Sequence, residues 1–308
     1  MQILDEQQVA GLSWQRVLGT LTEAFVLKAE RPDAYLMPER TVLSGPGGAI
    51  YLSMPCADAE GWFGVKQVAV VPNNAAKSRP TVQAWYTLFD PAGTPVLAMS
   101  ATILTRLRTA AVSAIAARHL ALPDANTLLV VGTGSLAPWM AEAHAQVRNY
   151  ARLLVWGRDG GKAERTAETL RERLPGISVE VEEDRAHALL AADVVTVATT
   201  ARDPILYGAW LREGQHLDLV GAFTPELAEV DGDAVKRAVV FVDDLAAAKA
   251  EAGDLIQAAA RNWSWQTVRG ELADVVTGRA GRRSADEITL FKSVGLGLED
   301  LAVSRLLL

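Results

Sequence analysis

The sequence predicts an α/β protein that combines a doubly wound parallel sheet with a separate α+β domain. Three observations predict this class. From residue 127 to about residue 252, short apolar runs alternate with helical stretches, the order that builds parallel strands joined by helices. Between residues 40 and 100, short β-type runs alternate with Gly, Pro and Asn turns. A glycine turn, Gly132-Thr133-Gly134, directly follows the first strand of the alternating region.

The first part of the chain is expected to be a helix followed by an antiparallel or mixed sheet. Residues 5–28 have an amphipathic pattern, with Asp5 and Gln8 as a capping box, and Arg31-Pro32 ends it. Strands are expected at 40–43, 49–54, 63–71, 82–89 and 96–99. The turn between residues 90 and 95 should close a hairpin. A long helix, 102–122, is rich in small residues that allow close packing.

The second part has the βα rhythm. Strands are expected near 128–131, 152–156, 178–181, 194–198, 216–220 and 239–242. Helices are expected near 137–148, 162–173, 184–191, 226–237 and 245–252. The segment 289–308 resembles a strand and a helix that return to the first domain. We therefore expect a discontinuous first domain of residues 1–115 with 289–308, and a second domain of residues 116–288.

The glycine turn predicts a dinucleotide site. The apolar run 128–131 suits a strand that is buried on both faces. Gly132 allows a tight turn, and Gly134 lets the backbone approach a pyrophosphate. Ala137 is the third small residue, and the helix that continues from Pro138 would point its N–H groups at the phosphates. This order of strand, turn and helix is the Rossmann pattern.

The end of the next strand indicates which dinucleotide is bound. An acidic residue at this point accepts the ribose 2′-OH of NAD, whereas an arginine accommodates the 2′-phosphate of NADP. Arg158 stands at the tip, with Lys162 behind it, which favours NADP(H). Asp159 is the alternative, because a turn one residue longer would make it the ribose acceptor.

Composition excludes several classes. The 308 residues carry a net charge of −7 and no sustained basic run, which argues against nucleic acid as a partner. No export leader begins the chain, and no apolar run approaches about 18 residues, so we expect no membrane span. A single cysteine, Cys56, favours a reducing compartment, the cytoplasm. No metal site is expected, because the four histidines lack ligand spacing: His119, His144, His187 and His216.

Two cations and one loop are candidates for the chemistry. Arg108 begins a helix that is otherwise suited to tight packing, where its guanidinium could grip a carboxylate; the alternative is a helix-surface arginine. Lys66 shares a strand face with valines, so it is either an edge charge or a cation directed into a cleft. The loop 220–226 follows a strand at the edge of the sheet where ligand clefts form.

At these residues the chain resembles the ornithine cyclodeaminase/μ-crystallin family, from about Glu39 to its C-terminal residues. The resemblance is carried by Glu39-Arg40-Thr41-Val42, Gly64-Val65-Lys66, Leu107-Arg108-Thr109-Ala110-Ala111-Val112-Ser113-Ala114, Val131-Gly132-Thr133-Gly134, Val220-Gly221-Ala222-x-x-Pro225 and Phe291-Lys292-Ser293-Val294-Gly295. It implies a homodimer in which the β-sheet of the first domain forms the interface.

The resemblance also implies residue roles. Arg40, Lys66 and Arg108 would bind the carboxylate of an amino or imino acid. The dinucleotide would be held by Gly132, Gly134, Ser135, Leu136 and Arg158, and its ribose and nicotinamide would be bordered by Thr199, Val220 and Ser293.

One position in the loop 220–226, Phe223, differs from the residue found in part of the family. Cyclodeaminases and the related archaeal alanine dehydrogenases have an aspartate two residues after the loop glycine, where this chain has Phe223. Phenylalanine cannot accept a proton, which argues against ornithine cyclisation. Relatives without this aspartate resemble ketimine reductases, including bacterial reductases of Δ1-pyrroline-2-carboxylate and Δ1-piperideine-2-carboxylate.

The sequence therefore predicts NAD(P)H-dependent reduction of a cyclic imino acid to L-proline or L-pipecolate, with NADPH preferred and NADH as the alternative. Arg40 and Arg108 would hold the carboxylate, and Lys66 would orient the substrate or help to protonate its nitrogen. Two alternatives stay open. One is a cyclodeaminase that uses Glu226 as a substitute base. The other is a non-catalytic protein that binds NADPH and a small ligand.

Overall fold

The computed structural model describes residues 1–77 and 79–308, which form two compact units. Unit 1 comprises Met1–Arg108 and Gly295–Leu308, and unit 2 comprises Thr109–Val294. The expected boundaries lay at residues 115 and 289. The structure instead divides the chain after Arg108 and after Val294. The first division falls within helix α3 (Ala101–Leu120), and the second leaves the last strand of the chain in unit 2.

Unit 1 is built on a seven-stranded sheet. Its order is β1 (Gln2–Leu4), β7 (Pro95–Ser100), β6 (Val82–Phe89), β5 (Phe63–Val70), β4 (Ile50–Asp58) and β2 (Tyr35–Leu36), with β3 (Thr41–Ser44) also on β4. β1 runs parallel to β7 and the other pairs are antiparallel, so the sheet is mixed, as predicted. The expected hairpin joins β6 to β7. In its turn the Asp90 N–H donates to the Thr94 carbonyl at 3.0 Å.

The first helical region is divided in two, where the sequence predicted one helix. α1 (Glu6–Ala10) begins with the predicted capping box of Asp5 and Gln8. The chain then turns at Gly11, and α2 (Trp14–Glu30) begins anew. Ser13 causes the second start, because its hydroxyl accepts the Arg16 N–H and so caps a new helix.

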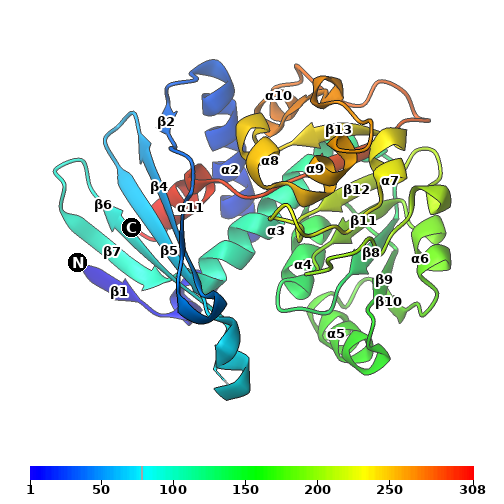
Figure 1. Ribbon diagram of the computed structural model, residues 1–308, viewed down its shortest axis with the longest axis horizontal. Helices are drawn as coiled ribbons and strands as arrows, with labels where there is room; N and C mark the ends of the chain where they lie inside the picture. The colour runs from blue at the N-terminus through cyan, green and yellow to red at the C-terminus, as the bar shows by residue number, and fades with distance from the viewer. Residues whose placement is uncertain (78) are drawn as a thin grey trace. The chain divides into compact units, whose positions relative to one another are not determined.

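Helix α11 (Gly297–Arg305) packs on β4, β5 and α2 within unit 1 (Figure 1). Glycines make this close packing possible. A Cβ on Gly64 would overlap the Tyr86 phenol on β6 and lie 3.3 Å from a methyl group of Leu301 on α11, and a Cβ on Gly297 would lie 3.0 Å from the Cβ of Cys56. Residues 297–304 are consequently all buried, Glu299 and Asp300 among them.

Unit 2 contains an eight-stranded sheet in which all pairs are parallel. Its order is β10 (Ser178–Val181), β9 (Arg152–Trp156), β8 (Thr127–Val131), β11 (Val194–Val197), β12 (His216–Leu219), β15 (Ile288–Lys292), β13 (Ala238–Val242) and β14 (Gly270–Glu271). All six predicted strands are present, and the doubly wound parallel sheet is confirmed. The short β14 was not expected.

The position of β15 corrects an expectation. The strand in residues 289–308 was expected to return to the first domain, but it lies between β12 and β13 in the parallel sheet. All five of its residues are buried, because it pairs on both edges and is covered on both faces. Only α11 returns to unit 1.

Helices cover both faces of the unit 2 sheet. α4 (Ala137–Val147) and α5 (Gly160–Arg173) contribute to one apolar core, and α6 (Arg185–Ala191), α7 (Gly232–Arg237), α8 (Leu245–Glu251) and α9 (Gly253–Ala259) contribute to the other. α7 begins later than expected because the Asp231 carboxylate accepts the Ala234 N–H and caps it there. α9 and α10 (Leu272–Val276) were not predicted.

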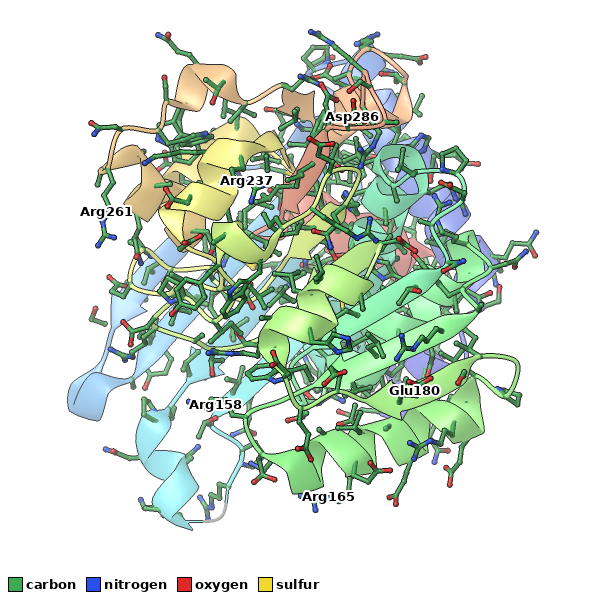
Figure 2. All side chains as sticks on the ribbon, turned by 90° about the vertical axis from the view of Figure 1, so that its right-hand side faces the viewer. Arg158, Arg165, Glu180, Arg237, Arg261 and Asp286 are labelled. Atoms are coloured by element: carbon green, nitrogen blue, oxygen red, sulfur yellow. The ribbon has the colours of Figure 1, made fainter. Side chains whose placement is uncertain are left out.

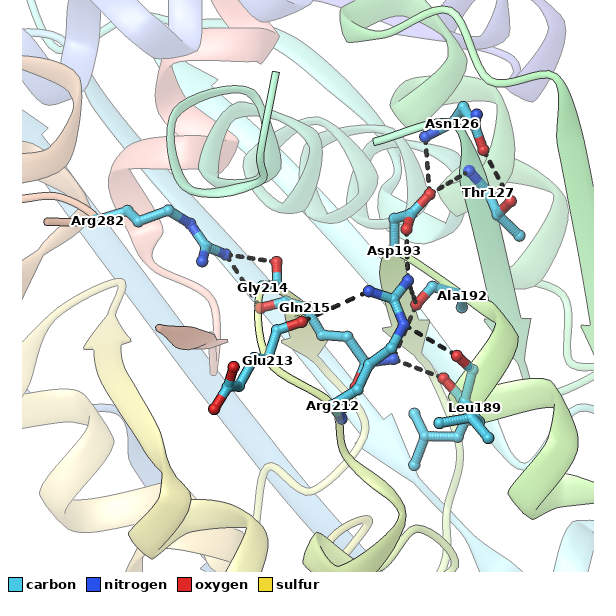
Figure 3. A network of polar contacts seen from close by, with 11 residues as sticks. Asn126, Thr127, Leu189, Ala192, Asp193, Arg212, Glu213, Gly214, Gln215 and Arg282 are labelled. Atoms are coloured by element: carbon cyan, nitrogen blue, oxygen red, sulfur yellow. Dashed lines mark hydrogen bonds and ion pairs between the residues drawn. The ribbon is translucent and has the colours of Figure 1, made fainter. Parts of the chain in front are cut away.

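The amino ends of the parallel strands carry a structural polar network (Figure 3). Asp193 accepts N–H groups of Asn126 and Thr127, each at 2.9 Å, at the start of β8. The Arg282 guanidinium donates to the carbonyls of Gly214 and Gln215, both at 3.0 Å, just before β12. These polar groups are engaged with one another, which leaves the carboxyl ends of the strands as the place for ligand chemistry.

No helix among residues 1–77 and 79–308 combines the length and the apolar character that crossing a membrane requires.

Candidate active site

The turn after β8 contains two glycines, Gly132 and Gly134, whose surroundings differ. Gly132 has φ of +117°, and a Cβ there would lie 2.6 Å from the Ala198 carbonyl oxygen. At Gly134, by contrast, a Cβ would meet no atom of the described residues within 4 Å. The fold itself therefore requires Gly132, whereas Gly134 leaves open space above the backbone. This is the space that a pyrophosphate needs.

Helix α4 begins at that open space. Ser135 and Leu136 precede it, and no side chain among the described residues caps its first N–H groups through the N-cap position. Pro138 occupies the first turn, where its missing N–H costs nothing. The positive end of the helix dipole favours an anion at this point. The turn and the helix start thus fit the phosphates of a dinucleotide.

Arg158 follows β9, and its side chain is exposed (Figure 2). Its neighbour Asp159 is engaged, because its carboxylate accepts the Lys162 N–H at 2.9 Å and caps α5. Close by, a Cβ on Gly157 would stand 2.5 Å from the methyl group of Thr133. The end of β9 is therefore packed against the glycine turn, which places Arg158 at the edge of the same site.

Thr199, Val220 and Ser293 follow β11, β12 and β15, which are neighbours in the sheet. The fold thus brings the three predicted ribose and nicotinamide contacts to one edge of unit 2. Glu229, which is fully buried, joins two of these loops. Its carboxylate accepts the Thr199 N–H at 2.7 Å, the Thr199 hydroxyl at 2.9 Å and the Gly221 N–H at 2.7 Å.

A second buried carboxylate supports Glu229. Asp254 accepts the Glu229 N–H at 2.6 Å and lies 3.0 Å from the Lys292 ammonium. Burial raises the pKa of Glu229 to about 7, with Lys292 opposing this shift and Asp254 adding to it. Sequence reasoning singled out neither carboxylate. Their signal was weak, because other acidic residues stand close to each of them in the sequence, such as Glu226 and Asp231 near Glu229 and Glu251 near Asp254.

In unit 1 the structure gathers the three predicted cations around the start of α11. Lys66 extends from β5 and Arg108 from α3, and their exposed fractions are 2% and 6%. The Lys66 ammonium lies 2.7 Å from Asp300, and Arg108 Nη1 lies 2.6 Å from Glu299. Arg40, just before β3, donates to the Gly295 carbonyl at 3.2 Å. Arg108 is therefore not a helix-surface arginine, and Lys66 is not an exposed edge charge.

Arg40, Lys66 and Arg108 thus bring three cationic groups to one place, beside the carboxylates of Glu299 and Asp300. Guanidinium and ammonium groups gathered in this way favour an anionic ligand such as a carboxylate. Burial, together with the charges of Arg108 and Arg40, lowers the pKa of Lys66 to about 8, and Asp300 opposes this shift. The sequence pattern singled out Lys66 and Arg108, the family resemblance added Arg40, and neither carboxylate on α11 was predicted.

Phe223 lies in the loop after β12, with its N–H donating to the Gly221 carbonyl at 3.1 Å and its side chain 40% exposed. The loop therefore offers an aromatic face at the position where a cyclodeaminase has its aspartate. Glu226, the residue considered as a substitute base, is exposed to solvent. Among residues 1–77 and 79–308, no three His, Cys, Asp or Glu side chains are grouped so that they could hold a metal ion.

The parallel sheet, the glycine turn and the buried cations define a protein with a dinucleotide-binding Rossmann unit and a second unit suited to a small anion. The chain belongs to the ornithine cyclodeaminase/mu-crystallin family, whose model matches residues 6–308.

Relatives with named activities lie within this family. The chain is 34% identical over 300 residues to a Δ1-pyrroline-2-carboxylate reductase of Paracoccus denitrificans, covering 95% of this chain and 91% of the relative. The Thermococcus litoralis Δ1-pyrroline-2-carboxylate reductase, solved with NADH and L-proline, superposes with a TM-score of 0.94 at 32% identity, covering 100% and 96% of the two chains. An archaeal alanine dehydrogenase dimer with bound NAD gives 0.92 at 30% identity, covering 99% and 94%.

Proposed function

We propose that this protein reduces a cyclic imino acid, Δ1-pyrroline-2-carboxylate or Δ1-piperideine-2-carboxylate, to L-proline or L-pipecolate with a reduced nicotinamide dinucleotide. The cluster of Arg40, Lys66 and Arg108 is the observation that carries this proposal, because two guanidinium groups and an ammonium group in one place suit the carboxylate of an imino acid. The likeness to the two Δ1-pyrroline-2-carboxylate reductases supports it. Phe223 supports it as well, since imine reduction needs no carboxylate base at that position.

Each cation has a separate task. Arg108 and Arg40 bind the substrate carboxylate, and their planar guanidinium groups fix its orientation. Lys66, protonated, orients the substrate and donates a proton toward the imine nitrogen, directly or through water. When bound, the dinucleotide supplies hydride to the imine carbon. One hydride and one proton convert the C=N bond into the C–H and N–H bonds of the product.

We propose NADPH as the preferred cofactor. Arg158 supports this choice, because an exposed guanidinium at the end of β9 can pair with a 2′-phosphate. Asp159, the alternative ribose acceptor, already caps α5. The backbone of Gly132, Gly134, Ser135 and Leu136 would hold the pyrophosphate, while Thr199, Val220 and Ser293 would border the ribose and nicotinamide.

We also propose a homodimer in the cytoplasm, formed through the outer face of the unit 1 sheet. Leu43, Tyr51 and Trp85 lie on that face on three strands, and their exposed fractions are 61%, 43% and 45%. A hollow of about 510 Å³ lies among them. Large apolar side chains in one patch are typical of an interface, and a second copy of the chain offers a matching apolar patch. The solved archaeal alanine dehydrogenase is a dimer.

The test is to follow NADPH absorbance with purified protein and Δ1-pyrroline-2-carboxylate, then Δ1-piperideine-2-carboxylate, and to repeat both with NADH. Ornithine with NAD, assayed for ammonia, is the control. Oxidation of NADPH with an imine and no ammonia from ornithine is the expected result. Ammonia release would instead favour a cyclodeaminase that uses Glu226. Tight NADPH binding without turnover of either imine would favour a binding protein.

A further inference from the structure

Two adjacent carboxylates on α11 have no contact with solvent. Glu299 and Asp300 are each 0% exposed, although α11 begins only two residues before Glu299. A buried carboxylate destabilises a fold unless it is paired and hydrogen-bonded. Each one meets a different cation: Glu299 Oε2 lies 2.6 Å from Arg108 Nη1, and Asp300 Oδ2 lies 2.7 Å from Lys66 Nζ. The shortest ion-pair contact of each carboxylate is therefore made with a different cation.

The two ion pairs differ in geometry. Glu299 also accepts the Leu296 N–H at 3.1 Å through its other oxygen, so both oxygens are engaged and the carboxylate is held in one orientation. Asp300 turns one oxygen to Lys66, and the other lies 3.4 Å from Arg108 Nε. Asp300 thus balances the charge of Lys66 and lies next to Arg108, whereas Glu299 holds the tip of Arg108.

The groups around Lys66 explain why it needs a carboxylate. Arg108 and Arg40 act on it as like charges. Tyr86, its partner across β5 and β6, is neutral, because burial raises the pKa of its phenol well above the usual value. Cys56, on β4, is neutral too, because burial raises the pKa of its thiol to about 12. Asp300 is the anion in contact with the ammonium, among the described residues.

We propose that Asp300 and Glu299 are positioning residues with separate tasks: Asp300 keeps the Lys66 ammonium charged and in place, and Glu299 holds the Arg108 guanidinium in the orientation that receives the substrate carboxylate. This inference rests on the proposed imine reduction. Neither carboxylate touches the substrate in this scheme; each acts through the cation that it contacts.

The two tasks predict different kinetic defects. Without the charge of Asp300, Lys66 stays buried beside two guanidinium groups, so its pKa falls and it loses its proton at a lower pH. In a plot of kcat/KM against pH, the decrease on the alkaline side (the alkaline limb) then occurs at lower pH. Without the charge of Glu299, Arg108 loses its anchor and the substrate carboxylate binds less tightly. KM then rises, while the alkaline limb stays in place.

Asp300→Asn and Glu299→Gln form a matched pair, since both changes keep the shape of the side chain and remove one charge. We expect Asp300→Asn to move the alkaline limb down by about one pH unit or more, and Asp300→Glu to restore part of it. We expect Glu299→Gln to raise KM for the imino acid about tenfold with an unmoved limb. The proposal is overturned when both variants lose stability alike and their pH profiles coincide with that of the wild type.

A measurement without substrate separates this inference from the proposed function. In protein with ¹³C-labelled lysine, the Lys66 signal is assigned by its loss in Lys66→Met and is titrated by NMR. A lower Lys66 pKa in Asp300→Asn, but not in Glu299→Gln, supports the positioning role even when no imine is reduced. An active enzyme whose Lys66 pKa is the same in wild type and Asp300→Asn contradicts the role of Asp300 while the reductase assignment stands.

Discussion

Gly295 lies directly against the guanidinium group of Arg108. A Cβ on this glycine would overlap Arg108 Nη1 and lie 2.8 Å from Nη2, and its φ is +86°. The Gly295 carbonyl also accepts a hydrogen bond from Arg40 at 3.2 Å. One glycine therefore touches two of the three cations that gather in unit 1, and a side chain at this position would displace the Arg108 guanidinium.

Gly295→Ala should displace Arg108 and raise KM for the imino acid at least about tenfold, with unchanged affinity for the dinucleotide. Steady-state kinetics and nucleotide titration measure the two effects. Gly93→Ala is the matched control, because Gly93 has φ of +78° in a unit 1 turn with open space around it. That variant should lose stability with KM unchanged. Equal KM values for both variants would refute the role of Gly295.

Gly134→Ala should leave the melting temperature unchanged and weaken dinucleotide binding about tenfold or more. Its Cβ would occupy the open space above the turn, where we place the pyrophosphate. Gly132→Ala should instead lower the melting temperature, because of its φ of +117° and the Ala198 carbonyl at 2.6 Å. Thermal melts and calorimetric titration with NADPH distinguish the two. Full affinity in folded Gly134→Ala would contradict the assigned site.

Arg158→Ala should reduce kcat/KM for NADPH by about one to two orders of magnitude and leave NADH almost unaffected, because the 2′-phosphate loses its cation. Asp159→Ala is the control. It removes the cap of α5, which should cost about 1 kcal/mol of stability without changing the cofactor preference. A selective loss of NADH activity in Asp159→Ala would instead identify Asp159 as the ribose acceptor.

Asp218→Asn should change how stability depends on pH. Burial raises the pKa of Asp218 from 3.8 to about 7, so the folded protein binds a proton that the unfolded chain releases in this window. Unfolding free energy therefore falls as pH rises from about 4 to 7, by at most about 4 kcal/mol from this group. His144, with its pKa lowered to about 4 by burial, contributes the opposite slope in both proteins. The melting temperature of the variant relative to wild type should rise between pH 5 and pH 8; a constant difference would refute this.

Trp85→Glu should convert the dimer into monomers by placing a charge in the apolar face that includes Leu43 and Tyr51. Light scattering coupled to gel filtration measures the mass. Leu190→Glu is the control, since Leu190 is 54% exposed and belongs to α6 of unit 2. It should stay dimeric. Monomeric wild type, or a dimer that tolerates Trp85→Glu, would exclude this face as the interface.

Local patterns in the sequence were sufficient for much of the fold. The strand, turn and helix around Gly132 and Gly134 are contiguous, so the dinucleotide site was predictable from residue types and spacing. Strand β15 shows what the local sequence pattern could not predict. Its apolar pattern identified a strand, but its partners depend on β12 and β13, which lie far away in sequence, and periodicity carries no information about pairing partners.

The supporting carboxylates were not predictable for a related reason. Glu299 and Asp300 stand in the first turn of a helix, where acidic residues usually face water and favour the helix dipole. Only the packing of α11 on β4 and β5 buries them beside Arg108 and Lys66. A cation in a buried stretch is conspicuous in sequence, whereas a distant counter-ion is not, and Glu299 follows Arg108 by 191 residues.

Because β15 lies between β12 and β13, the parallel sheet of unit 2 is completed only late in the sequence. Strands β12 and β13 are complete by residue 242, yet they have no edge in common until residues 288–292 pair between them. A growing chain that ends before residue 288 therefore lacks the strand that pairs with β12 on one edge and with β13 on the other. Such edges invite pairing with other chains. Binding of a chaperone to nascent chains that stop before residue 288 is the expected cellular counterpart of this sheet order.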